Sequence, residues 1–142
     1  MATKTLLVAI DFSPASHRAL GLARELATAL GAEVTLVHAY EVPFTIGDLS
    51  PMLVQQFYAE AVPSATRALE SLAREHGVTR TFFREGAPGP EICRVAEEIA
   101  PAFIVMGTHG RSALRHLVTG SVAAYVIRHA KVPVITVRDP ST

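Results

Sequence analysis

Five short apolar segments alternate with longer amphipathic segments along the chain. The apolar segments are continuous, which is typical of strands that helices cover on both faces. We therefore predict five strands in a parallel sheet, at residues 5–10, 34–39, 78–84, 102–106 and 132–137. The third segment is less apolar than the others, and this indicates a place at the edge of the sheet.

The segments between the predicted strands have the apolar spacing of helices. Ser13 followed by Pro14 predicts a capped helix start, and Gly31 predicts the end of that helix. Ile92 begins an i, i+3, i+4, i+7 pattern that indicates a third helix. In the fourth helix we expect four residues to face inward: Val122, Val126, Ile127 and Ala130.

The second helical segment, residues 51–76, contains Pro63. A proline inside a helix removes one backbone hydrogen bond, and its ring clashes with the preceding turn. The sequence therefore predicts a kink or a break near Val62.

Alternating strands and helices without an internal repeat predict an α/β fold in one domain, 1–142, with an open parallel sheet and helices on both faces. Right-handed crossovers restrict the possible strand orders to a few. Ligands of such sheets bind beyond the carboxyl ends of the strands, where the strand order reverses.

Composition excludes several functional classes. The 142 residues are 49% apolar with a net charge of zero, so there is no electrostatic reason to expect a nucleic-acid or membrane partner. No apolar segment approaches the ~20 residues that span a bilayer, and the N-terminus does not look like a signal peptide. The single cysteine, Cys93, fits a reducing compartment and inert packing. We expect a cytoplasmic protein.

Three glycines follow the fourth predicted strand with the spacing Gly107-x2-Gly110-x9-Gly120, and Ser121 comes next. Glycine is used where a ligand must approach the backbone closely. Ser121 is expected to cap the following helix, whose first N–H groups favour an anion. A strand, a glycine-lined loop and a capped helix together predict a phosphate-binding site.

This glycine and serine spacing resembles the nucleotide-binding motif of the universal stress protein family. The start of the chain, LLVAIDFSPAS, and its end, VPVITVR, are also similar to that family. The resemblance covers nearly all of the chain. It implies the Rossmann-like strand order 3-2-1-4-5, a role in stress response or regulation, and a homodimer formed through Val132–Val137.

The resemblance also implies that the chain belongs to the ATP-binding branch of the family, with Mg²⁺ held by the phosphates. Ala39 matches the family position whose main chain meets adenine, and Ala9 and Ile10 match the wall of the base pocket. The glycine loop and the main chain at Val122 would hold the phosphates. The candidate nucleotide-binding residues are Ala9, Ile10, Asp11, Ala39, Met106, Gly107, Gly110, Arg111, Gly120, Ser121 and Val122.

With strand order 3-2-1-4-5, Asp11 and Gly107 should border the same cleft. Asp11 could contact a ribose hydroxyl, a water or Mg²⁺ in its outer sphere, or it could only cap the next helix. The glycines could likewise be ordinary turn residues, and Met106 could simply fill the core. Arg111 could bind phosphate or remain solvated. We expect valine at Gly110 or Gly120 to abolish nucleotide binding without disturbing the fold.

The sequence does not predict an efficient enzyme. It has no G-x4-G-K-[ST] motif, no G-x-S-x-G motif and no lysine near the glycine loop, so we expect at most slow ATP hydrolysis and no catalytic residue. No set of side chains has the spacing of a zinc site. The alternative is an adenylating enzyme of the adenine-nucleotide α-hydrolase type. Such enzymes have a glycine-rich loop after the first strand, whereas residues 11–16 contain no glycine.

Overall fold

A computed structural model describes residues 3–41, 50–109 and 120–139. The strands are β1 (Lys4–Ala9), β2 (Ala32–Tyr40), β3 (Arg80–Glu85), β4 (Phe103–Gly107) and β5 (Val134–Val137). The helices are α1 (Pro14–Leu30), α2 (Pro51–Glu75), α3 (Pro88–Ile99) and α4 (Ser121–His129). All four strand pairs are parallel, and the order β3-β2-β1-β4-β5 confirms the predicted topology.

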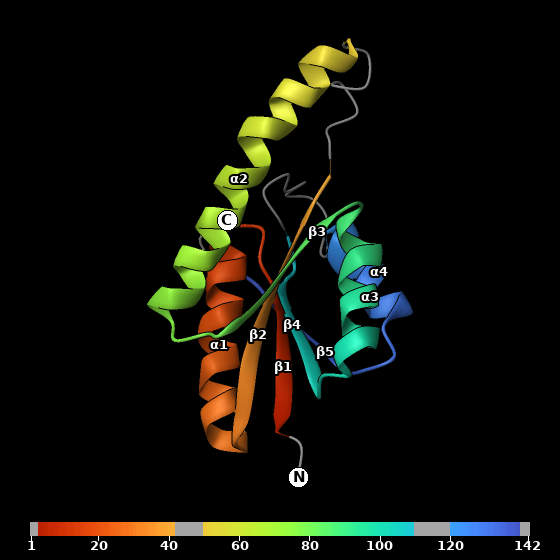
Figure 1. Cartoon of the computed structure of the whole chain (residues 1–142). Coiled ribbons are helices and arrows are strands. Elements are labelled where there is room, and N and C mark those ends of the chain that lie inside the picture. The colour runs from red at the N-terminus through yellow and green to blue at the C-terminus, as the bar shows by residue number, and fades with distance from the viewer. Residues whose placement is uncertain (1–2, 42–49, 110–119, 140–142) are drawn as a thin grey trace.

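Helices α1 and α2 cover one face of the sheet, and α3 and α4 cover the other (Figure 1). Side chains alternate along a strand, so Leu7 and Ala9 face α3 and α4, whereas Val8 and Ile10 face α1 and α2. Each set belongs to a separate buried apolar cluster, and Leu7 and Val8 have no solvent exposure. This two-sided burial explains why the strand segments are continuously apolar. As predicted, β3 lies at an edge of the sheet.

The predicted helix signals of α1 are confirmed in detail. Ser13 is the N-cap, its Oγ accepts a hydrogen bond from the backbone N–H of Ser16 at 3.2 Å, and Pro14 is the first helical residue. Gly31 ends the helix in the left-handed conformation with φ +64°. Ser13 and Pro14 thus fix where α1 begins relative to the end of β1.

Helix α2 differs from the prediction, because it continues through Pro63 as one helix (Figure 1). The structure therefore excludes the predicted break near Val62, whereas the other form of the prediction, a kink, stays untested. Proline removes a single donor, and this part of the helix is largely exposed, so water can hydrate the carbonyl that loses its partner.

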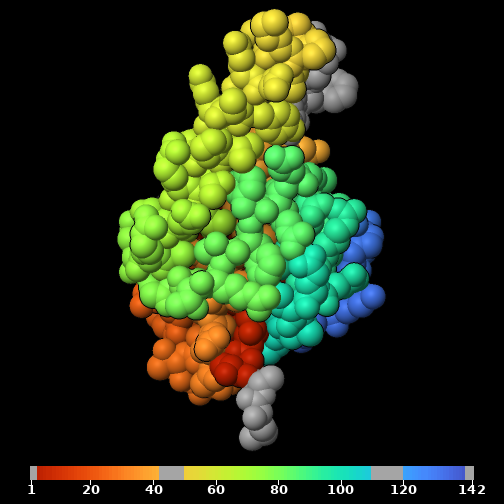
Figure 2. Space-filling model, in the orientation of Figure 1, coloured from red at the N-terminus to blue at the C-terminus, as the bar shows by residue number. Residues whose placement is uncertain are grey.

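The N-terminal half of α2 extends beyond the body of the domain (Figure 2). The first buried residue of this helix is Leu69, and only its C-terminal half joins the core through Leu69, Leu72 and Ala73. Met52 lies at the far tip and is 69% exposed. Within the described ranges no helix is both long and apolar enough to cross a membrane.

One prediction for helix α4 is wrong. Val126 is fully buried, and Val122 and Ala130 pack against the core as expected. Ile127, however, is 52% exposed, and its place is taken by Ala123, which is 1% exposed. Ala123 and Val126 are three residues apart and share one face of the helix, whereas Ile127 lies beyond the edge of that face.

Candidate functional site

A cavity of about 1220 Å³ lies at the carboxyl ends of the strands. Asp11 and Gly107 both border it, so the predicted cleft between these two residues is confirmed. Every described candidate residue lines this cavity: Ala9, Ile10, Asp11, Ala39, Met106, Gly107, Gly120, Ser121 and Val122. The other two candidates, Gly110 and Arg111, lie outside the described residues.

Asp11 belongs to a tight turn that connects β1 to α1. Its Oδ1 accepts a hydrogen bond from the backbone N–H of Ser13 at 2.9 Å. Between them Phe12 has φ +64°, a left-handed conformation that is unusual for a bulky residue and is found most often at functional sites. The carboxylate therefore supports the start of α1, as the alternative interpretation stated. It is also half-buried at the cavity wall.

A glycine is needed at position 107 because of close packing, which the sequence did not reveal. A Cβ atom added at this position would lie 2.7 Å from the Cβ of Ala15 and 3.1 Å from its carbonyl carbon. The missing side chain lets the end of β4 lie directly against the first turn of α1. This contact brings the two sides of the cavity together.

A glycine is also needed at position 120, where the close contact is with the backbone after β4. Its backbone N–H donates to the Thr108 carbonyl at 2.5 Å, and an added Cβ would lie 2.7 Å from that same oxygen. The chain thus returns to the end of β4 before α4 begins. For Gly107 and Gly120, close backbone packing is required whether or not a ligand is present.

Ser121 does not have the predicted capping role. The N-cap of α4 is Gly120, whose carbonyl accepts from the N–H of Ala124 at 2.9 Å, and no side chain caps this helix end. The helix begins one residue earlier than expected because the close approach to Thr108 sets the Gly120 backbone. The exposed Ser121 is the first helical residue, and its hydroxyl is not used as a cap.

The base end of the predicted site is apolar. Ala9 is 8% exposed and Met106 is 4% exposed, and both belong to the buried cluster under α3 and α4. Ile10 is 3% exposed, and its N–H donates to the Val37 carbonyl at 2.8 Å. Met106 therefore fills the core, as the alternative interpretation stated, and it also lines the cavity; its contact with a nucleotide stays a prediction.

Sequence reasoning missed one wall of the cavity, which α2 provides. The α2 residues on this wall are Phe57, Ala61, Ser64, Ala65 and Ala68. The signal was available, because these positions recur every three or four residues and four of the five side chains are small. The described lining also includes Phe12, Ser13, His38, Tyr40, Thr108 and His109, which were not predicted.

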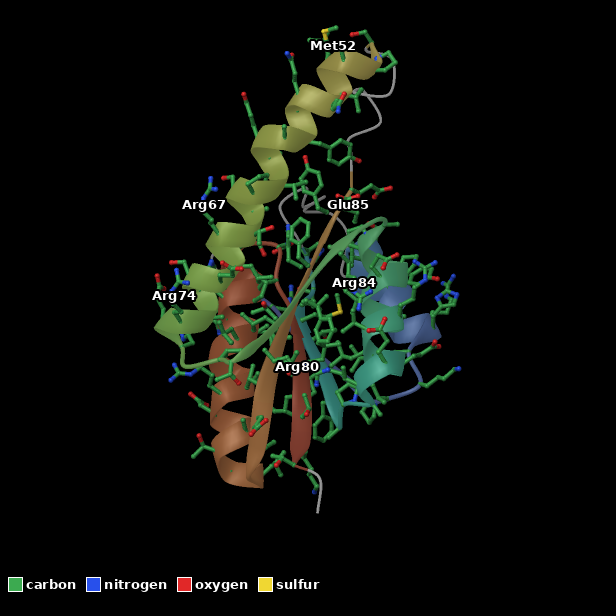
Figure 3. All side chains as sticks on the ribbon, in the orientation of Figure 1. Met52, Arg67, Arg74, Arg80, Arg84 and Glu85 are labelled. Atoms are coloured by element: carbon green, nitrogen blue, oxygen red, sulfur yellow. The ribbon has the colours of Figure 1, made fainter. Side chains whose placement is uncertain are left out.

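The described part of the cavity wall contains carboxylates but no arginine or lysine. Asp11 and Glu41 are its acidic residues. The α2 residues Arg67 and Arg74 lie on the side of the helix that faces away from the sheet (Figure 3). Burial, and to a smaller extent the neighbouring Tyr58, raise the pKa of the Tyr40 phenol, so this lining residue stays neutral over a wider pH range.

Cys93 lies on α3, away from the cavity lining, and packs partly buried against the core. Burial raises the pKa of its thiol, and the nearby Glu97 carboxylate raises it further. A raised pKa leaves less of the reactive thiolate, in agreement with a packing role.

Comparison with known proteins gives a consistent result. The model of the universal stress protein family matches residues 2–138. The chain is 33% identical to universal stress protein MJ0531 of Methanocaldococcus jannaschii, over 96% of this chain and 83% of that protein. It is 35% identical to a universal stress protein of Thermus aquaticus, over 95% of this chain and 98% of that protein.

Solved structures agree with this result. The structure of the protein MJ0577 matches with a TM-score of 0.86 and 25% identity, and each chain is covered completely. A universal stress protein in complex with cAMP matches with a TM-score of 0.66 and 26% identity, over 96% of this chain and 98% of that one. The family model and both relatives extend over almost the whole chain, and the chain therefore belongs to the universal stress protein family.

Proposed function

We propose that this protein binds ATP, or another adenine nucleotide, and acts as a nucleotide-dependent module in stress response or regulation. One observation carries the proposal: a single cavity collects the turn at Asp11, the end of β2 at Ala39 and the N-terminus of α4 at Gly120. A related universal stress protein has been solved with cAMP, which is also an adenine nucleotide.

The cavity supports binding of the phosphates by backbone groups. The N–H groups of Ser121 and Val122, in the first turn of α4, have no acceptor within the helix, and no side chain of the described residues caps this end. Both residues line the cavity together with Gly120, whose own N–H donates to Thr108. The described wall is acidic, so a bare triphosphate would be repelled at Asp11. A divalent cation on the phosphates would remove that repulsion.

The residues present fit Mg²⁺ only as an ion carried by the nucleotide. Among the described residues no three acidic, histidine or cysteine side chains cluster to hold a metal. Oδ1 of Asp11 accepts the Ser13 N–H, and we propose that the carboxylate contacts the ion through a water rather than directly. Mg²⁺ commonly keeps several waters and uses substrate phosphates as ligands.

Binding is favoured over turnover. The described lining has no lysine or arginine to stabilise a developing negative charge, and Asp11 is engaged in its turn. We therefore propose a cytoplasmic binding protein whose hydrolysis of ATP is slow at most. Release of pyrophosphate with a candidate substrate would instead support the adenylating enzyme.

The proposal includes a homodimer formed through β5. This strand is at the edge of the sheet, and the side chains of Val134, Ile135 and Val137 are only partly covered. An edge strand leaves backbone groups unpaired, and pairing with a second copy across a two-fold axis would satisfy them.

The first experiment identifies the resident ligand. Freshly purified protein is denatured, the supernatant is separated by chromatography, and any released nucleotide is identified by its mass. We expect an adenine nucleotide.

We also expect ATP with Mg²⁺ to raise the melting temperature. A ligand at 100 times its dissociation constant stabilises the folded state by about 2.7 kcal/mol, which is roughly 5–10 °C for a domain of this size. The measurement is a thermal melt with and without millimolar ATP, with inorganic triphosphate and Mg²⁺ as the control for the phosphate alone. An unchanged melting temperature at millimolar ATP would show that the proposal is wrong.

A further inference from the structure

The cavity extends over both faces of the sheet, because its lining includes Ala65 of α2 and Ile92 of α3. Side chains alternate along β2, so Ala39 faces α3 and α4 together with Val37, whereas His38 faces α1 and α2. The volume of about 1220 Å³ exceeds the roughly 300–1000 Å³ that is usual for the pocket of one small ligand. The cavity therefore has room for a second ligand besides the proposed nucleotide.

One part of the cavity, which we call the α2 lobe, lies between α2 and the sheet face that bears His38. Its walls are formed by six residues: Phe12, His38, Tyr40, Phe57, Ala61 and Ala65. On the α2 side, Ala61 and Ala65 are one helical turn apart, and their small side chains leave space between the helix and the sheet.

His38 contributes a buried hydrogen-bond acceptor to the α2 lobe. The residue is 9% exposed, and its Nδ1 lies 2.7 Å from the Ile10 carbonyl oxygen. A carbonyl oxygen only accepts, so Nδ1 donates, and Nε2 of the neutral ring is an acceptor. Within residues 3–41, 50–109 and 120–139, Nε2 has no hydrogen-bond partner. No side-chain nitrogen or oxygen of these residues is both sealed from solvent and unpaired, so Nε2 opens into the cavity that the ring borders.

Aromatic rings form much of the remaining wall of the α2 lobe. The ring of Phe12 lies 5.0 Å from that of His38 between centroids. Tyr40 stacks on Phe57 of α2 at 6.4 Å with an interplanar angle of 28°. Aromatic rings gain energy from stacked or edge-to-face contacts with other rings, so these walls favour a flat aromatic ligand.

We infer that the α2 lobe is a second ligand subsite, for a neutral, flat aromatic molecule that carries one N–H or O–H donor. The ligand ring would lie among the aromatic and alanine side chains, and its donor would bond to Nε2 of His38. An acceptor at an apolar wall selects for a donor, because a ligand without one leaves the acceptor unpaired. Asp11 and Glu41 on the cavity wall disfavour a ligand with negative charge.

Indole is the probe that tests this inference, and benzofuran is its matched control. The two molecules have nearly the same shape, but benzofuran has an oxygen in place of the N–H group. The chain contains no tryptophan, so the fluorescence of indole reports its binding directly, and benzofuran is measured by displacement of indole. We expect indole to bind about three- to tenfold more tightly than benzofuran through its hydrogen bond to His38.

Two variants locate the bound indole. His38→Asn keeps a donor close to the position of Nδ1 and removes the acceptor at Nε2, so the preference for indole over benzofuran should disappear. Ala65→Leu fills the α2 lobe, so binding of both probes should be lost. Ala59→Leu is its control, because Ala59 is an exposed residue of the same helix that does not line the cavity. Thermal melts confirm that each variant is folded.

Several results would overturn the inference. Wild-type protein that binds neither probe, or a folded Ala65→Leu protein that binds indole as tightly as wild type, would refute the subsite. Equal affinity of wild type for the two probes, or a preference that persists in His38→Asn, would refute the role of His38. If His38→Asn does not fold, His38→Gln is used, because its amide can offer an acceptor near Nε2; the loss of the preference in this variant would then contradict the proposal.

A measurement with ATP separates this subsite from the proposed nucleotide site. Ala9 and Met106, which are proposed for the base, belong to the cluster under α3 and α4, on the opposite face of the sheet from His38. Indole should therefore stay bound in millimolar ATP with Mg²⁺. Displacement of indole by ATP would place both ligands in one site and overturn the inference. Binding of indole by a protein whose melting temperature ATP leaves unchanged would support the subsite and refute the proposed function.

Discussion

Gly120→Ala should unfold at a temperature roughly 3–10 °C lower than the wild-type protein, a loss of about 1–3 kcal/mol. The added Cβ would lie 2.7 Å from the Thr108 carbonyl oxygen and 3.3 Å from the Cα of His109. Both are backbone atoms, so neither can move aside as a flexible side chain would. The conflict also strains the hydrogen bond from the Gly120 N–H to Thr108. Thermal and urea unfolding without nucleotide measure the effect.

Gly21→Ala is the matched control. Gly21 is an exposed residue within α1, and an added Cβ meets nothing within 4 Å. Alanine at an open helical position stabilises a protein by about 0.5–1 kcal/mol. The two variants should therefore shift the melting temperature in opposite directions. Equal shifts, or a Gly120→Ala protein as stable as wild type, would contradict the packing role of Gly120.

This result changes how glycine variants of the loop are interpreted. From the sequence we expected valine at Gly120 to abolish nucleotide binding and leave the fold intact. The structure corrects this expectation, because even a methyl group at Gly120 conflicts with the backbone of Thr108. Loss of binding in such a variant would not separate a lost ligand contact from a displaced α4.

The architecture could be predicted because burial of the sheet leaves a strong pattern of apolar residues in the sequence. Strands covered on both faces are continuously apolar, as in Leu6–Ile10, and the caps at Ser13 and Gly31 are local signals. The strand order came from family resemblance, because periodicity does not determine which strands are neighbours. Once the order was known, the meeting of Asp11 and Gly107 at one cavity followed from topology.

Other features depend on contacts between residues far apart in the sequence. Glycine is needed at positions 107 and 120 because Ala15 and Thr108 lie too close for a side chain. No local sequence pattern encodes these contacts. The hydrogen bond between Nδ1 of His38 and the Ile10 carbonyl is another such contact, because it depends on how β2 lies beside the end of β1.

The proposed dimer leads to the second large effect: Thr136→Pro should convert a particle of about 30 kDa, twice the 15.2 kDa chain, into a monomer. The carbonyl of Pro133, just before β5, accepts from the N–H of Ile104 in β4, and the carbonyl of Val137 accepts from the N–H of Thr108, just after β4. Parallel strands alternate the direction of their backbone groups, so the N–H of Thr136 points to the open edge. Proline removes this donor and keeps the bonds to β4, and edge strands tolerate it. Light scattering at tens of micromolar measures the mass.

Thr136→Val is the control, because valine has nearly the shape of threonine and keeps the backbone N–H. Thr136 is exposed, so its hydroxyl is not needed inside the domain. The valine variant should remain dimeric, and both variants should show the circular dichroism of a folded α/β protein. A dimeric Thr136→Pro protein would place the interface elsewhere, and a monomeric wild-type protein would refute the dimer itself. If both variants are monomeric, the threonine side chain rather than the strand backbone holds the two copies together.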